Sequence, residues 1–152
     1  MKTDIDYMKF AIIEAEKAAS NNEIPVGAII INETGDIIAR GHNKVITLND
    51  PTAHAEIIAL RMAAQNLKNY RLINTSIYVT LEPCIMCMSA IIHARVKRLV
   101  FGAKDPKWGG AGSLYDFTSD NRLNHQIETY GGILNKEASY IIKNFFKNKR
   151  SK

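Results

Sequence analysis

Hydrophobic and polar positions follow a helical period at the start of the chain and short extended runs soon after it. Phe10, Ile13 and Ala18 recur at helical spacing and predict an amphipathic helix over about Asp4–Asn21. The apolar run Val26–Ile31 then predicts a strand. A polar turn with Gly35 free to take positive φ leads into a second strand, Ile37–Gly41, so the two runs predict a hairpin.

The remaining pattern alternates between helices and strands. It predicts a helix over Thr52–Leu67, a strand over Ile77–Val79, a helix over Pro83–His93, a strand over Arg98–Gly102, a loop over Asp105–Ser113, a strand over Gln126–Tyr130 and a closing helix over Asn135–Lys147. Strands joined by helices, twice over, favour an α/β fold with helices packed on a mixed sheet.

Composition adds that the chain is a soluble globular protein of one domain. Its 152 residues are 46% hydrophobic and 23% charged. The polar start lacks the apolar segment of a secretory signal, and the apolar runs fall far below the roughly 20 residues that span a bilayer. We therefore expect a cytoplasmic protein over residues 1–152, without a membrane partner.

The net charge of +5 is concentrated at the C-terminus. Residues 143–152 carry five basic groups and no acid, whereas Met1–Ile142 holds fifteen basic and fifteen acidic residues. A basic helix or tail at about 143–152 suits a polyanionic partner. A solvated, frayed end is the competing interpretation.

Two short motifs carry the candidate chemistry. Cys84 and Cys87 stand three apart, so on a helix both thiols share one face. Near a helix start the dipole favours thiolate, the form that binds zinc. His54 and Glu56 lie near the start of another predicted helix, where their side chains can converge beyond its end.

Together the motifs indicate a catalytic zinc site. His54, Cys84 and Cys87 would leave the fourth position of a tetrahedral zinc open. Water there would lose a proton near neutral pH, and the resulting hydroxide could attack a ring carbon. Glu56 would move protons from that water to the ring nitrogen and the departing ammonia. The His-x-Glu and Pro-Cys-x-x-Cys pattern is the signature of zinc deaminases of nucleobases.

Two simpler interpretations compete with this one. The cysteine pair could be a redox dithiol, or half of a structural zinc site. A structural site needs a fourth ligand, and the other histidines, His42, His93 and His125, lack the close spacing of a zinc finger. Glu56 discriminates further, because a structural site does not require it.

Over nearly its whole length the chain resembles the bacterial tRNA-specific adenosine deaminases, in the cytidine deaminase-like superfamily. The matching stretches are Glu23–Ala28, Gly41–Asn43, Asp50–Glu56, Tyr70–Leu72, Tyr78–Cys87, Arg98–Ala103, Gly112–Leu114, Asn124–His125 and Phe145–Phe146.

This resemblance implies conversion of adenosine to inosine at the wobble position of a tRNA anticodon. It implies a three-layer α/β/α fold, with a mixed five-stranded sheet between helices. It also implies one zinc ion per subunit, and a homodimer that binds the anticodon stem-loop. The substrate-binding positions it implies are Asn43 against the flipped base, Glu82 and Pro83 at the pocket floor, Val26 and Ala55 in the pocket, Asp105 and Lys107 beside the RNA backbone, and Phe145 and Phe146.

The residues alone leave some of these roles open. Asn43 could equally be a turn residue, and Asp105 a plain loop acid. A deaminase of free guanine or cytosine shares the two motifs, although the basic tail with its Phe pair favours a nucleic acid. Trp108 departs from the small or polar residue expected there, and suits either a stacking platform for a base or a dimer contact. Met88-Ser89 also departs from the small residues of many relatives.

Overall fold

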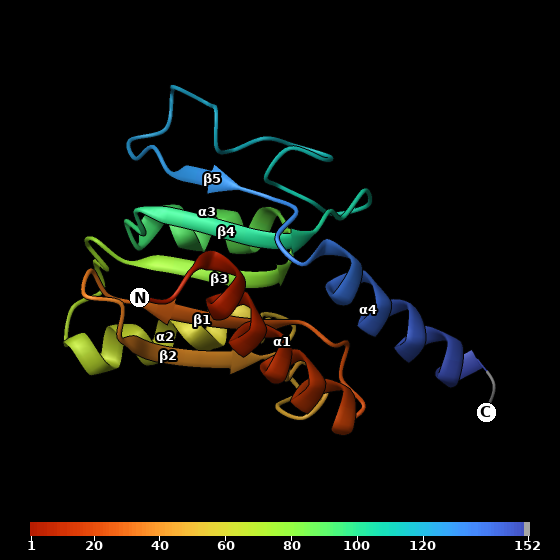
Figure 1. The fold of residues 1–152 in the computed structure, drawn as a ribbon. Coiled ribbons are helices and arrows are strands. Elements are labelled where there is room, and N and C mark those ends of the chain that lie inside the picture. Colours follow the sequence, from red (N-terminus) through yellow and green to blue (C-terminus); the bar gives the residue numbers. More distant parts are fainter. Residues whose placement is uncertain (151–152) are drawn as a thin grey trace.

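The computed structural model describes residues 1–150 of the chain, and Figure 1 shows them as a ribbon. The elements are α1 (Asp4–Ser20), β1 (Gly27–Ile31), β2 (Ile37–His42), α2 (Ala55–Leu67), β3 (Ser76–Leu81), α3 (Ile85–His93), β4 (Arg98–Ala103), β5 (Glu128–Tyr130) and α4 (Asn135–Arg150).

The strands form one mixed sheet in the order β2-β1-β3-β4-β5. β1 pairs antiparallel with both β2 and β3, whereas β3, β4 and β5 run parallel. The carboxyl ends of the parallel strands therefore meet at one edge, where α/β sheets place ligands. The predicted α/β fold with a mixed five-stranded sheet is confirmed.

The sheet lies between two layers of helices. In Figure 1, α1 and α4 lie on one face, with α2 and α3 behind the other. The strands alternate accordingly: Ile29 and Ile31 of β1 pack in the cluster that contains α1, and Ala28 and Ile30 pack with α2 and α3. The three-layer arrangement is likewise confirmed.

Helix α1 buries most, but not all, of the apolar positions that predict it. Ile13 is 45% exposed, whereas Tyr7, Ala11, Ala15 and Ala18 are buried. Alanines face the sheet because the helix lies very close to β1: a Cβ on Gly27 would collide with the backbone of Ala11 and Ala15. Of the three positions that predicted the apolar stripe, Ala18 is buried and Phe10 packs against the core, but Ile13 is exposed.

The two helices that carry the motifs begin later than predicted. α2 begins at Ala55 instead of Thr52, because the Asp50 carboxylate accepts hydrogen bonds from the backbone N–H and the hydroxyl of Thr52 and holds this segment in a turn. α3 begins at Ile85 instead of Pro83, with the backbone of Cys84 extended.

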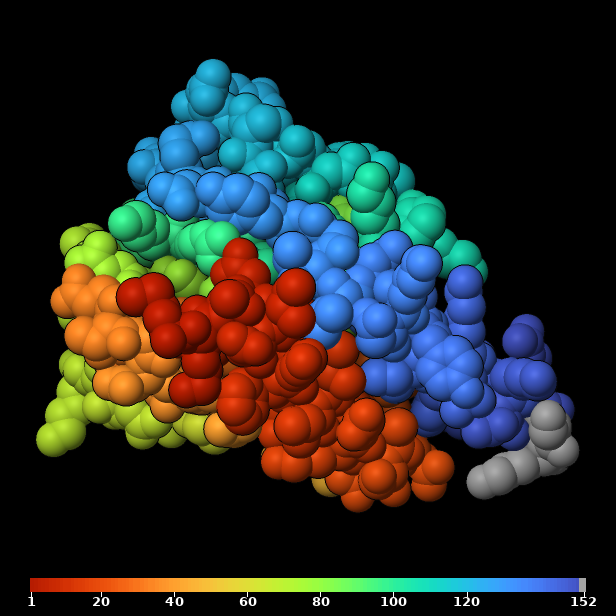
Figure 2. All heavy atoms as spheres, viewed as in Figure 1, coloured from red at the N-terminus to blue at the C-terminus, as the bar shows by residue number. Residues whose placement is uncertain are grey.

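The C-terminal helix is longer than predicted. α4 ends at Arg150 instead of Lys147, and residues 151–152 of the predicted basic tail lie outside the described part of the chain. Figure 2 shows this helix at one end of the molecule, beside the surface formed by α1. Among residues 1–150, no helix has both the length and the apolar character needed to cross a membrane.

Candidate metal centre and active site

His54, Cys84 and Cys87 converge on one point. Their candidate ligand atoms all lie within 4.8 Å of one another. His54 Nδ1 is 3.6 Å from the Sγ of Cys84 and 3.4 Å from the Sγ of Cys87. His54 immediately precedes α2 and Cys84 immediately precedes α3, so two helix starts meet at this cluster.

The chemistry of this donor set fits zinc. One imidazole and two thiols are typical zinc ligands, and three protein ligands leave one position of a tetrahedral ion open. A hydrogen bond with Cys87, and then one with His54, lowers the pKa of Cys84 to about 4. The same pairing, reinforced by burial, raises the pKa of Cys87. A cation between the two sulfurs would hold both as thiolates.

A fourth protein ligand is absent from this cluster within residues 1–150. Of the other histidines, His42 contacts Glu14 through Nδ1, and His125 contacts the backbone carbonyl of Val96 through Nε2. The three-ligand set therefore suits an open, catalytic zinc site better than a closed, structural one.

Glu56 lies in the first turn of α2 and is 3% exposed. Burial raises the pKa of this carboxyl to about 7, against the opposing effect of the nearby His54 charge. The carboxyl shares a cavity with His54 and Cys84. A buried carboxyl beside the metal ligands can both take up and release a proton.

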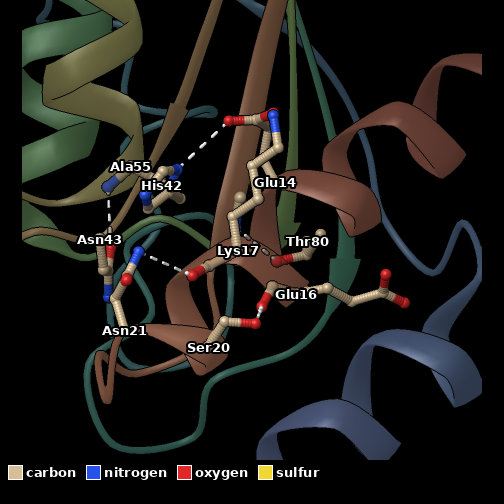
Figure 3. A network of polar contacts seen from close by, with 10 residues as sticks. Glu14, Glu16, Lys17, Ser20, Asn21, His42, Asn43, Ala55 and Thr80 are labelled. Atoms are coloured by element: carbon tan, nitrogen blue, oxygen red, sulfur yellow. Dashed lines mark hydrogen bonds and ion pairs between the residues drawn. The ribbon is translucent and has the colours of Figure 1, made fainter.

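Asn43, the residue directly after β2, holds the start of α2. Its side-chain carbonyl accepts a 2.8 Å hydrogen bond from the backbone N–H of Ala55, as Figure 3 shows. This carbonyl replaces the cap that His54 does not provide. Because the oxygen is occupied, the amide N–H₂ of Asn43 is the group free to donate toward the cavity that the residue lines.

The end of β2 that presents Asn43 is fixed by a buried carboxylate of α1. Glu14 accepts a 2.7 Å hydrogen bond from Lys17 and lies 3.3 Å from His42 Nδ1 (Figure 3). Burial alone would raise the pKa of Glu14, but the Lys17 and His42 contacts outweigh burial and lower it. The Lys17 and His42 contacts therefore keep Glu14 ionised against the end of β2.

A cavity of about 690 Å³ opens above the metal cluster. Val26, Asn43, Glu82 and Asp105, each predicted to bind substrate, line it. Ala55, Pro83, Lys107, Phe145 and Phe146 are not among its lining residues. Lys107 is exposed on the segment after β4, and the two phenylalanines lie on α4.

Glu82 has a role that its place in the motif did not indicate. Its carboxylate is 2% exposed and accepts hydrogen bonds from four donors of the segment after β4: the backbone N–H groups of Asp105, Ala111 and Ser113, and the Ser113 hydroxyl. Glu82 thus fastens this segment to the chain that carries Cys84.

The sequence did not assign several cavity residues, namely Ile24, Pro51, Leu81, Ile85 and Met86. All of them fall inside stretches that resemble the family, which is the one signal that could have found them. Glu23, next to Ile24, is buried and binds the backbone N–H groups of Ile46 and Thr47, so it holds the loop that follows Asn43.

Comparison with known proteins agrees with this geometry. The family model for the cytidine and deoxycytidylate deaminase zinc-binding region matches residues 1–103, which include His54, Glu56 and both cysteines. The tRNA-specific adenosine deaminase of Haemophilus influenzae is 50% identical over 97% of this chain and 85% of its own length.

Solved structures share the fold. A structure from work on A-to-I editing by tRNA:A34 deaminases at the wobble position of transfer RNA is 43% identical, with a TM-score of 0.85 over 89% of this chain and 97% of that one. The guanine deaminase of Bacillus subtilis is 33% identical, with a TM-score of 0.63 over 96% and 92%. The chain belongs to the family of tRNA-specific adenosine deaminases, which carry the cytidine and deoxycytidylate deaminase zinc-binding region.

Proposed function

We propose that this protein hydrolyses adenosine to inosine at the wobble position of a tRNA anticodon, consuming water and releasing ammonia. The observation that carries the proposal is the buried Glu56 carboxyl in one cavity with an open three-ligand metal site. Identity of 43–50% to tRNA adenosine deaminases, against 33% to a guanine deaminase, supports the substrate.

His54, Cys84 and Cys87 would hold one zinc ion per subunit. When bound, zinc supplies a Lewis acid that makes water a nucleophile near neutral pH. Glu56 would take one proton from the attacking water and pass it to the ring nitrogen, and would then pass the proton of the newly formed hydroxyl to the departing amino group, so that ammonia leaves. The burial of Glu56 excludes bulk water from these transfers.

Asn43 orients the base in this proposal. With its carbonyl bound to the N–H of Ala55, its amide nitrogen donates to an acceptor on the edge of the flipped adenine. Val26, Ala55, Glu82 and Pro83 would shape the pocket around the base.

RNA contacts outside the cavity would come from the segment after β4 and from α4. Lys107 is exposed and suits a phosphate, and Asp105 holds the backbone beside it. On α4, Phe145 lines a groove against α1 while Phe146 is 41% exposed. Phe146 and the basic residues around it would meet the anticodon stem-loop.

We also propose that residues 1–152 act as one deaminase domain in a cytoplasmic homodimer. A shallow groove between α2 and α3 is lined by Leu60, Ala64, Ala90 and Tyr70, and Tyr70 is 68% exposed. A second copy of the chain would cover this apolar surface. Analytical ultracentrifugation of the protein and of Tyr70→Glu tests this, since a buried negative charge should shift the equilibrium toward monomer.

The test of the proposed activity compares substrates. The purified zinc protein should form inosine on an anticodon stem-loop with adenosine at the wobble position, and should release little ammonia from free guanine, cytosine or adenosine. Faster turnover of free guanine than of the stem-loop would identify a free-base deaminase instead.

A further inference from the structure

Trp108, the only tryptophan of the chain, lies at the mouth of the active-site cavity. The residue is 64% exposed, yet it lines the same cavity as His54 and Glu56. Among residues 1–150, its indole makes no aromatic or cation–π contact. A large apolar ring is thus left open to solvent beside the catalytic groups.

The backbone that carries Trp108 is held on both sides. The Asp105 carboxylate accepts hydrogen bonds from the backbone N–H groups of Lys107 and Trp108, at 3.1 and 3.3 Å. Beyond the ring, Glu82 binds Ala111 and Ser113. A Cβ at Gly109 would collide with the Glu82 carboxylate, so glycine permits this close contact. The exposed ring therefore stands on an ordered segment.

The surroundings suit a nucleotide. Lys104 and Lys107 are both exposed on the same segment, close in sequence to the ring. The cavity is also lined by the apolar residues Ile24 and Pro51. An aromatic ring on an ordered backbone, with cations close by in sequence, is a common arrangement for binding single-stranded nucleic acid, where bases stack and phosphates meet positive charge.

The target base must reach the buried Glu56 and the metal ligands, whereas the indole is 64% exposed, so the indole is better placed for a neighbouring base. We propose that Trp108 stacks on the nucleobase next to the target adenosine, and so positions the RNA strand at the cavity mouth. This inference rests on the proposed function. Because the backbone that carries the ring is already ordered, binding does not have to order this segment.

The chain's single tryptophan makes this stacking directly observable. Indole fluorescence of the zinc-loaded Glu56→Ala protein, which binds without turnover, should be quenched by the stem-loop. A stem-loop with an abasic nucleotide on one side of the wobble adenosine should lose most of the quenching, and free adenosine should cause none. Quenching that persists with abasic nucleotides on either side would overturn the proposal.

Substitutions supply the second arm. Trp108→Ala should weaken stem-loop binding about fivefold to a hundredfold, the equivalent of unstacking one base. Trp108→Phe should recover most of that affinity. Tyr115→Ala is the control, because Tyr115 is exposed on the same segment but stacks on Phe117 outside the cavity. Unchanged affinity of Trp108→Ala would overturn the proposal.

Two further measurements distinguish base stacking by Trp108 from a subunit contact and from a failure of the proposed activity. Sedimentation of Trp108→Ala should match the parent protein; a loss of dimer would assign the ring to a subunit contact and overturn the proposal. Inosine formation by the parent protein is scored separately, so a failure of the proposed activity is recognised independently of the fluorescence result.

Discussion

The side-chain carbonyl of Asn43 accepts the backbone N–H of Ala55, one residue after His54 and one before Glu56. One side chain thus both caps α2 and lines the cavity. We expect Asn43→Asp to keep the cap, since a carboxylate also accepts this hydrogen bond, but to lose the N–H donor.

Comparing two substitutions at Asn43 therefore separates its roles. Asn43→Ala should lower the free energy of unfolding by about 0.5–2 kcal/mol through the lost cap and should also reduce turnover. Asn43→Asp should reduce turnover with little loss of stability. Stem-loop kinetics and calorimetry measure both, and normal turnover by Asn43→Asp would contradict the base-reading role.

Glu56→Gln should keep the fold and the zinc but lose at least about 10²–10⁴-fold in single-turnover rate, because an amide cannot shuttle protons. Zinc content and the melting temperature are the controls. A nearly normal rate with zinc present would assign proton transfer to another group.

Removal of a ligand should remove the metal. Purified parent protein should contain about one zinc per chain, and His54→Ala or Cys87→Ser should contain much less. The exposed His93 provides the matched control, since His93→Ala should keep its zinc. Elemental analysis measures all four proteins; zinc-free parent protein with a reversible Cys84–Cys87 disulfide would favour the redox interpretation.

Asp4 should make stability depend on pH. Arg98 donates to both carboxylate oxygens, at 2.7 and 2.6 Å, and Tyr78 donates to one of them. The hydrogen bond from Arg98 is the main reason that the pKa of Asp4 is lowered. Because the folded pKa lies below the unfolded value of about 3.9, the stabilisation is present above that pH and is lost as the pH falls through the folded pKa.

Asp4→Asn should therefore cost about 1–2 kcal/mol at pH 7, and this difference should shrink as the pH falls below about 4. Urea unfolding across that range measures it. Glu16→Gln removes one exposed charge from the same helix and should change little. An equal cost for Asp4→Asn at all pH values would contradict an ionised pair.

Removal of residues 147–152 tests the basic end. The truncated protein should bind the stem-loop more weakly, and its affinity should depend less on salt. The log–log slope should flatten by about 0.7 for each phosphate of single-stranded RNA that the tail would otherwise neutralise. Zinc content should not change. Lys9→Gln, which removes an exposed charge from α1, is the control. Unaltered stem-loop affinity and salt dependence would indicate that the tail only aids solubility.

The fold class and the reactive residues were predictable because both depend on local patterns. His54 with Glu56, and Cys84 with Cys87, stand in two closely spaced pairs, and the strands are short apolar runs. The helix starts were less predictable: Asp50 draws Thr52 into a turn, which leaves His54 extended before α2.

Interactions between distant parts of the chain could not be predicted from the sequence. Glu82 meets its partners 23 to 31 positions later, so only the folded sheet reveals it as the anchor of the Trp108 segment. The close packing of α1 likewise depends on Gly27 of a neighbouring strand, and Ile13, which the helical pattern placed among the apolar positions, is exposed.

Both helix starts at the metal cluster use residues that are poor caps. His54 and Cys84 occupy the capping positions of α2 and α3, and neither side chain makes a capping hydrogen bond. Asn43 compensates α2 alone. In the metal-free protein the first amides of α3 should therefore exchange with solvent deuterium sooner than those of α2. Zinc would slow the exchange of both sets of amides, because it would bind only when both helix starts are folded. The metal supply would then determine how often the site opens locally, as well as its reactivity.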